Sequence, residues 1–77
     1  MRVSVHLHAD LERLSHGGVV VLDLPNGARV EDAVRQLRIP TNRRVIVGVN
    51  GAAAQQDQVL EDGARLDVLP PMAGGAH

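Results

Sequence analysis

Few side chains in this sequence could do chemistry, and two histidines are the first of them. His6 and His8 lie two residues apart in an alternating segment, so a β-strand would place both imidazoles on one face. Imidazole is a common metal ligand, and His16 or Asp10 could supply a third donor. No fourth ligand has a convincing spacing, so we favour a solvated outer strand face over a metal site.

A second candidate is the pair Arg43-Arg44 in the middle of the chain. Two adjacent arginines could dock an acidic partner or a phosphate, although such pairs in loops are more often plain surface. The chain has no cysteine, which excludes disulfides, a thiolate nucleophile, iron–sulfur clusters and cysteine zinc sites. If the protein handles sulfur, it cannot carry it as a persulfide on its own side chain.

A third candidate is the glycine pair Gly74-Gly75, which follows Pro70-Pro71. Glycine lacks a Cβ, so it permits close backbone approach and unusual φ/ψ angles. The prolines stiffen the exit from the fold, so we expect a domain over residues 1–71 and a flexible tail over residues 72–77. A glycine pair alone is weak evidence, because the last residues of a chain are often only a loose end.

Composition limits the protein to one small domain with an aliphatic core. The chain has 77 residues, of which 44% are apolar and none is aromatic. Eight arginines and nine acidic residues give a net charge of −1, so we expect no nucleic-acid partner. No apolar run approaches membrane-spanning or signal-peptide length, so we expect no membrane association and a cytoplasmic location.

Apolar periodicity predicts the elements that must position these residues. Residues 2–8 and 19–24 read as two half-buried strands, joined through a turn at residues 15–18 into a hairpin with a long connection. Residues 30–37 change to the helical period, and the helix must stop before Pro40. Such a short helix is stable only when it packs on the sheet.

The second half of the chain predicts two more strands. Residues 45–49 form a strand that ends at the tight turn Asn50-Gly51, and residues 52–58 read as polar and irregular. A last strand alternates around residues 66–68 and ends at Pro70-Pro71. We therefore predict an α+β layer, a mixed four- to five-stranded sheet with one helix across one face. The first and last strands are expected to lie side by side.

Three segments carry a family resemblance that covers the whole chain. The order of elements resembles the ubiquitin β-grasp, and residues 60–75 (LEDGARLDVLPPMAGG) closely resemble the ends of the molybdopterin synthase small subunit and the thiamine-pathway sulfur carrier. Val49-Asn50-Gly51 and residues 27–32 match two further landmarks. The sequence is thus identified as a member of the ubiquitin-like sulfur-carrier family.

The resemblance implies a protein co-substrate and not an enzyme. A ubiquitin-activating-like adenylyltransferase would use ATP and magnesium to adenylate the carboxylate of Gly75, which then becomes a thiocarboxylate. A sulfur-accepting synthase of molybdopterin, thiamine or another sulfur pathway would take up the sulfur. Gly74 would shape access to the channel, and the chain itself would bind no cofactor. Leu69, Met72 and Ala73 are predicted to form a partner surface beside the tail, with partial packing on the sheet edge as the alternative for Leu69 and Met72.

Two positions depart from the family pattern. Ala76 and His77 follow the glycine pair, so Gly75 has no free carboxylate until they are removed; a zinc metalloprotease that trims the tail is the expected partner. The helix N-cap position holds Arg29, where the family usually has Thr or Ser. Arginine cannot accept a hydrogen bond, which predicts a cost of about 1 kcal/mol at the start of the helix.

Two other functions stay open at this stage. The chain could be a ubiquitin-like modifier that is conjugated to other proteins through Gly75; its own lack of lysine would prevent chains linked through side chains. It could also be a β-grasp interaction module without tail chemistry. The trailing Ala76-His77 favours a processed carrier, whereas residues 70–75 favour the molybdopterin type.

Overall fold

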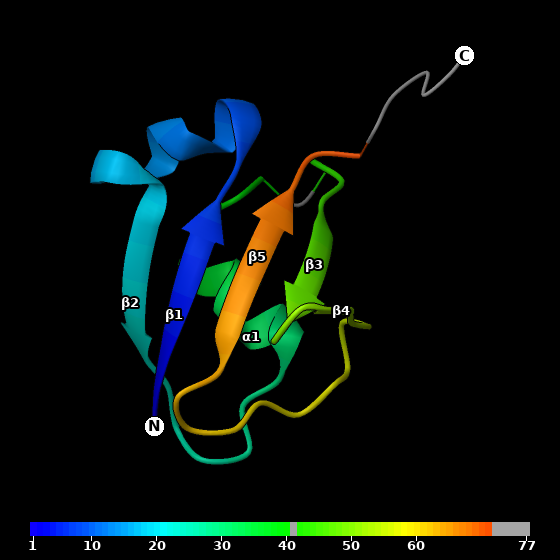
Figure 1. Cartoon of the computed structure of the whole chain (residues 1–77). Helices are drawn as coiled ribbons and strands as arrows, with labels where there is room; N and C mark the ends of the chain where they lie inside the picture. The colour runs from blue at the N-terminus through cyan, green and yellow to red at the C-terminus, as the bar shows by residue number, and fades with distance from the viewer. Residues whose placement is uncertain (41, 72–77) are drawn as a thin grey trace.

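In the described part of the chain, five strands form one mixed sheet, and a single α-helix lies across one face of it (Figure 1). The computed structural model describes residues 1–40 and 42–71. The elements are β1 (Arg2–Leu7), the 3₁₀ helices η1 (Ala9–Leu14) and η2 (His16–Gly18), β2 (Val19–Asp23), α1 (Val30–Gln36), β3 (Ile46–Val49), β4 (Ala52–Ala53) and β5 (Arg65–Leu69).

The strand order is β2-β1-β5-β3-β4, and only the central β1–β5 pair is parallel. Val5 pairs with Leu66 in this parallel register, so strands from the two ends of the chain lie side by side. The expected neighbourhood of the first and last strands is therefore confirmed, as are the mixed sheet and the single helix.

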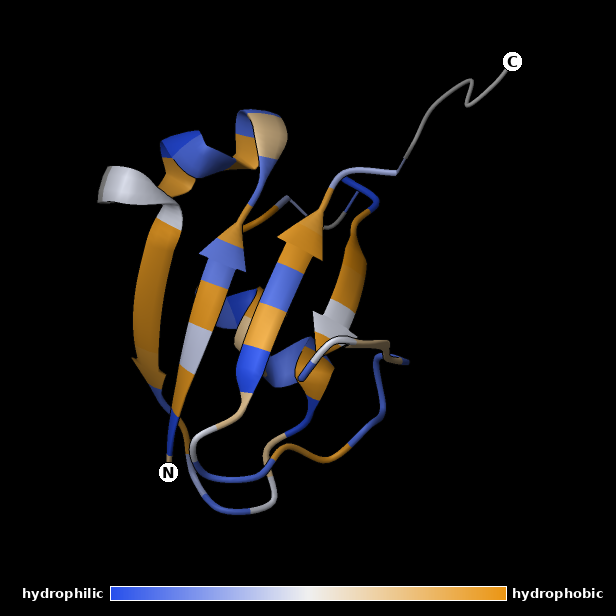
Figure 2. Ribbon diagram, viewed as in Figure 1, coloured by the Kyte–Doolittle hydropathy of each residue, from blue (hydrophilic) through white to orange (hydrophobic). Residues whose placement is uncertain are grey.

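The core lies between the sheet and α1, and the other face of the sheet is open. Alternate residues of β1, β3 and β5 are buried, and Leu66 and Val68 at the centre have no exposed area. Figure 2 shows the same alternation as bands of hydrophobic and hydrophilic colour along β1 and β5. The apolar face predicted for the helix also packs on the sheet, with Val30 and Ala33 fully buried. An aliphatic core thus forms without any aromatic ring.

The start of α1 differs from expectation. The Arg29 side chain makes no capping hydrogen bond, but the Asp32 carboxylate accepts from the Arg29 backbone N–H at 2.8 Å. The next two amides, of Val30 and Glu31, donate to the carbonyls of Gln58 and Gln56 at 3.0 and 2.9 Å. A neighbouring loop therefore satisfies free N–H groups of the first turn that a capping side chain would otherwise accept from, and the predicted cost of an arginine at this position stays a prediction.

Two further features were not predicted. The connection between β1 and β2 is 3₁₀-helical, and Leu11 from η1 is buried in the core. Residues 52–58 were expected to be irregular, but Ala52 and Ala53 form β4. The turn before β4 has φ values of 51° at Asn50 and 87° at Gly51, the left-handed pair of a type I′ hairpin, whose twist brings the two alanines onto β3.

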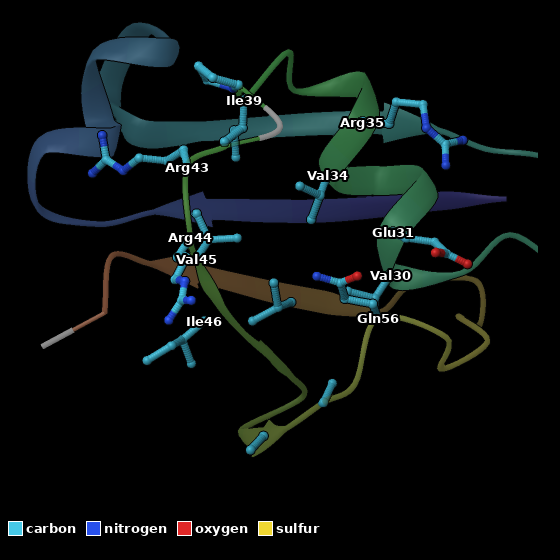
Figure 3. Close-up of a pocket in the computed structure, with 14 residues that line it drawn as sticks. Val30, Glu31, Val34, Arg35, Ile39, Arg43, Arg44, Val45, Ile46 and Gln56 are labelled. Carbon is cyan, nitrogen blue, oxygen red and sulfur yellow. The ribbon is translucent and has the colours of Figure 1, made fainter.

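A groove of about 610 Å³ runs between α1 and the edge of β3 (Figure 3). Val30 and Val34 line its helix side, and Val45 and Val47 line its strand side. The groove is on the helix-covered side of the sheet, away from the open face. Within residues 1–40 and 42–71, no helix has the length and apolar content needed to cross a membrane.

Candidate functional site

The candidate site is the end of the sheet from which the predicted tail leaves. β5 ends at Leu69, and the half-buried Pro70 and exposed Pro71 follow it. The other predicted site residues lie outside the described part of the chain; they are Met72, Ala73, Gly74, Gly75, Ala76 and His77. The described residues therefore show what surrounds the base of the tail.

Leu69 stands on the open face of the sheet beside a second exposed aliphatic residue. Its exposed fraction is 38%, and its cross-strand partner in β3, Ile46, is 47% exposed. The parallel register of β1 and β5 continues from Leu7–Val68 to His8, which lies next to Leu69 on the other side. We call these three residues, His8, Leu69 and Ile46, the tail-side patch. Exposed apolar side chains such as Leu69 and Ile46 are typical of a docking surface.

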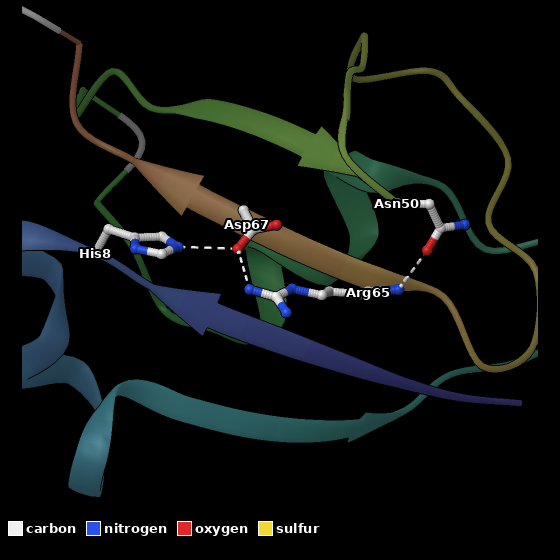
Figure 4. A network of polar contacts seen from close by, with 4 residues as sticks. All are labelled: His8, Asn50, Arg65 and Asp67. Atoms are coloured by element: carbon white, nitrogen blue, oxygen red, sulfur yellow. Dashed lines mark hydrogen bonds and ion pairs between the residues drawn. The ribbon is translucent and has the colours of Figure 1, made fainter.

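A polar network adjoins the tail-side patch on the same face (Figure 4). The Nε2 atom of His8 lies 2.9 Å from the Oδ1 atom of Asp67, and the Arg65 guanidinium donates to the same oxygen at 3.2 Å. The hydrogen bond from His8, with a further contribution from Arg65, holds the pKa of the Asp67 carboxyl below its ordinary value. The network fixes an anion between two groups that carry or can carry positive charge.

The backbone of Arg65 is held as well. Its N–H donates to the side-chain oxygen of Asn50 at 2.9 Å, and the Asn50 N–H donates to the Arg65 carbonyl at 2.8 Å. The β3–β4 turn is thereby tied to the start of β5. β5, the strand that leads to residues 72–77, is thus held on one side by the contact of Asp67 with His8 and on the other by the contact of Arg65 with Asn50.

The remaining sequence candidates do not converge on this site. His8 is paired with Asp67, and within residues 1–40 and 42–71 no group of three or more potential metal ligands comes together. Arg43 forms an ion pair with Asp10 at 2.9 Å, and this hydrogen bond lowers the pKa of the Asp10 carboxyl. Asp10 is therefore tied to the β3 side of the molecule and does not join the histidines.

Sequence reasoning missed Ile46, Asp67 and the partnership of His8. Ile46 alternates with buried Val47 and Val49, and this pattern is a signal that could have placed it on the open face. The contact between His8 and Asp67 joins residues 59 positions apart. It depends on the parallel register, for which the sequence carries no local signal.

The arrangement of five strands, one helix and a chain that leaves the end of β5 defines the ubiquitin-like β-grasp class of proteins. A family model described as the ThiS family matches residues 5–75. The chain belongs to this family, and the predicted membership of the ubiquitin-like sulfur carriers is confirmed. No curated protein sequence matches the chain.

Solved structures agree with this assignment. The crystal structure of SAMP1 from Haloferax volcanii is similar with a TM-score of 0.81 at 26% identity, over 97% of this chain and 100% of that one. A putative molybdopterin converting factor, subunit 1, from Pyrococcus furiosus gives 0.79 at 26%, over 92% and 98%. A second structure of H. volcanii small archaeal modifier protein 1 gives 0.81 at 25%, over 92% and 98%.

Proposed function

We propose that this chain is a sulfur carrier that is activated at Gly75 after removal of Ala76 and His77. The observation that supports the proposal most directly is the family match, which extends through residues 5–75 and so includes the glycine pair. Family membership joins the fold to the one segment whose residue types suit the chemistry. The described domain then serves to hold and present the tail.

The proposed reaction begins with a carboxylate that does not exist until the tail is trimmed. Hydrolysis of the bond between Gly75 and Ala76 by a zinc metalloprotease would free the carboxylate of Gly75. That carboxylate attacks the α-phosphate of ATP, with magnesium held by the activating enzyme, and pyrophosphate leaves. Sulfide that attacks the acyl-adenylate displaces AMP and gives the thiocarboxylate directly. A persulfide donor displaces AMP to form an acyl disulfide, whose S–S bond a partner's thiol must then reduce to release the thiocarboxylate. The thiocarboxylate passes its sulfur to a synthase of cofactor or metabolite biosynthesis.

The tail-side patch has a definite place in this proposal. An activating enzyme must bind the folded domain firmly enough to position a flexible carboxylate, so it needs a surface close to the base of the tail. Leu69 and Ile46 supply exposed aliphatic area there, and the polar network of His8, Asp67 and Arg65 adjoins it on the side of β1 and β5. An apolar centre with a polar border is the usual organisation of a protein interface.

Intact-protein mass spectrometry of the untagged chain from its native host tests the proposal. We expect a species that lacks Ala76 and His77, part of which carries sulfur in place of one oxygen. Gly75→Ala should abolish the sulfur-containing form, and a matched variant at the exposed loop residue Asp57, Asp57→Ala, should leave it unchanged. If all molecules keep Ala76 and His77 and none carries sulfur, the sulfur-carrier function is wrong.

A second function is supported by the two similar H. volcanii structures, SAMP1 and small archaeal modifier protein 1. By analogy, this chain would be conjugated through Gly75 to lysines of other proteins. The chain has no lysine side chain that could accept a second copy of itself, and its Met1 amine is engaged by the Leu24 carbonyl, to which it donates at 2.7 Å. Adducts of higher mass that disappear in the Gly75→Ala variant would establish this function; their absence beside a thiocarboxylate would leave the carrier function alone.

A further inference from the structure

We propose that the groove between α1 and β3 binds an extended segment of a partner protein, apolar along its length and acidic at the end next to Arg44. This surface lies on the helix-covered side of the sheet; it shares Ile46, at the edge of β3, with the tail-side patch, but it does not include His8 or Leu69. The proposal therefore does not depend on the chemistry of Gly75. It concerns a partner segment that binds the domain in the groove, in addition to any contact that a partner makes with the tail-side patch.

The walls of the groove are aliphatic and come from α1 and the segment that leads into β3. Val34 of α1 is only partly buried, although it belongs to the apolar stripe of the helix. It faces Val45, which is also partly buried and immediately precedes β3. Figure 3 shows both valines between the helix and the strand. A segment that enters the groove would cover the exposed area of both valines.

The edge of β3 is open along this groove. β4 pairs with β3 only at Gly48 and Val49, through Ala53 and Ala52. The shorter strand therefore leaves the outer edge of Val45 and Ile46 uncovered by a neighbouring strand. An exposed strand edge beside an apolar groove is the geometry in which an extended peptide adds to a sheet, with backbone hydrogen bonds for affinity and side chains in the groove for specificity.

Charge gives the occupant a direction. Arg35 and Arg43 line the groove, but Arg35 is paired with Asp32 at 3.1 Å and Arg43 with Asp10 at 2.9 Å. Arg44 has no ion pair within the described residues.

The one carboxylate in the lining, Glu31, stands at the start of α1, and Figure 3 places it at the opposite end from Arg44. A carboxylate on the occupant is favoured at the Arg44 end and repelled at the Glu31 end.

The position of Arg44 also relates the groove to the tail. Ile46 pairs with Leu69 across β3 and β5, so Arg44 and Pro71, each two residues further out, lie at the same end of the sheet. A partner that fills the groove and also receives the tail would hold the domain at two points. Two linked contacts of this kind raise the overall affinity without a change in either one.

Peptide selection followed by NMR mapping tests the proposal on the full chain. Phage-displayed random ten-residue peptides are selected on the immobilised protein and counter-selected on Arg44→Glu. Recovered peptides are then synthesised and titrated into the ¹⁵N-labelled chain. We expect peptides that combine aliphatic residues with Asp or Glu at one end, and amide shifts concentrated at Val34, Val45 and Ala53.

Matched variants separate the charge from the groove. Arg44→Glu should weaken binding about five- to tenfold, since an exposed ion pair is replaced by a repulsion, whereas Arg44→Lys should stay within about threefold. Arg2→Glu reverses an exposed charge on the open face and should change affinity by less than about twofold. Ala53→Glu places a carboxylate in the lining at an exposed position and should also weaken binding.

Several outcomes would overturn the proposal. Failure to enrich any peptide on the unmodified chain relative to Arg44→Glu would do so, as would enrichment of basic peptides. Shifts at His8 and Leu69 in place of Val34 and Val45 would assign the peptides to the open face. Concentration-dependent shifts at the groove without any peptide would show that a second copy of the chain occupies it.

Discussion

Replacing Leu69 and Ile46 with alanine should weaken recognition of the carrier by its activating enzyme without unfolding it. Both side chains are on the open face at the base of the tail, with 38% and 47% of their area exposed. Under the proposed function this area becomes buried when the enzyme binds. The double variant removes most of it while leaving the buried face of the sheet intact.

The expected effect follows from the exposed fractions. Full burial of a leucine or isoleucine side chain contributes about 1.5–3 kcal/mol, so the exposed 38% and 47% represent about 0.6–1.1 and 0.7–1.4 kcal/mol. Together these values correspond to a loss of about 10- to 70-fold. The loss should raise KM for the carrier and leave kcat unchanged, because the patch contributes the same binding energy before and during adenylation.

The assay is ATP–pyrophosphate exchange by the activating enzyme of the same organism, with the trimmed carrier ending at Gly75 as the varied substrate. The matched control is Val59→Ala, which truncates a 53%-exposed valine in the loop that bridges to Arg29, away from the open face. Val59→Ala should unfold in urea within about 0.5 kcal/mol of the parent, as exposed substitutions usually do. The double variant also loses the buried part of two side chains that pair across β3 and β5, so it should be less stable, and KM is measured at a temperature at which circular dichroism shows it folded. An equal effect of Val59→Ala, or an unchanged KM for the double variant, would refute the assignment of the tail-side patch.

Three further predictions concern the fold that carries the site. Leu66→Ala removes a side chain with no exposed area from the central strand and should lower the free energy of unfolding by about 2–5 kcal/mol in urea, enough to unfold much of so small a domain; a loss below about 1 kcal/mol would contradict the described core. The folded-state pKa of Asp67 is depressed, so its pairing stabilises above the unfolded value near about pH 4 and is lost as the pH falls through the folded value. Asp67→Asn should therefore cost about 0.5–1 kcal/mol at neutral pH and progressively less as the pH falls below about 4, as urea titrations at several pH values would show; a constant difference would argue against this charge effect. Asp32→Ala removes the 2.8 Å acceptor for the Arg29 N–H and should cost about 0.5–2 kcal/mol by thermal unfolding, against no change for the exposed Asp57→Ala.

The elements that contribute most to the core could be predicted from the sequence. β1, β2, β5 and α1 each place apolar residues at the period of their own structure, because one face of each must be buried. The Asn50-Gly51 turn was also predicted from the sequence, because Asn-Gly favours positive φ angles, and both residues adopt them. These signals are local. They identified every major element, and they placed residues 72–77 directly after the last strand.

What the sequence did not reveal depends on contacts between distant segments. β4 consists of two alanines, which carry no strand signal and pair with β3 only because the preceding turn brings them there. The amides of Val30 and Glu31 are satisfied by carbonyls more than twenty residues away, so no capping residue was needed where one was expected. The tail-side patch joins residues of three neighbouring chain segments through the strand register, and the groove joins α1 to β3; neither composition follows from spacing along the chain.

The parallel pairing of β1 with β5 has a consequence for the order of events during synthesis. The two strands are separated by about sixty residues, so the centre of the sheet cannot form until β5 has left the ribosome. Until then Val3, Val5 and Val47 lack the strand that lies between them. Residues 72–77 are made immediately afterwards, so every chain that can offer its glycine pair already contains the strand that completes the fold. An enzyme that binds both the open face of the sheet and the tail would therefore act only on chains whose synthesis is complete and whose sheet has formed.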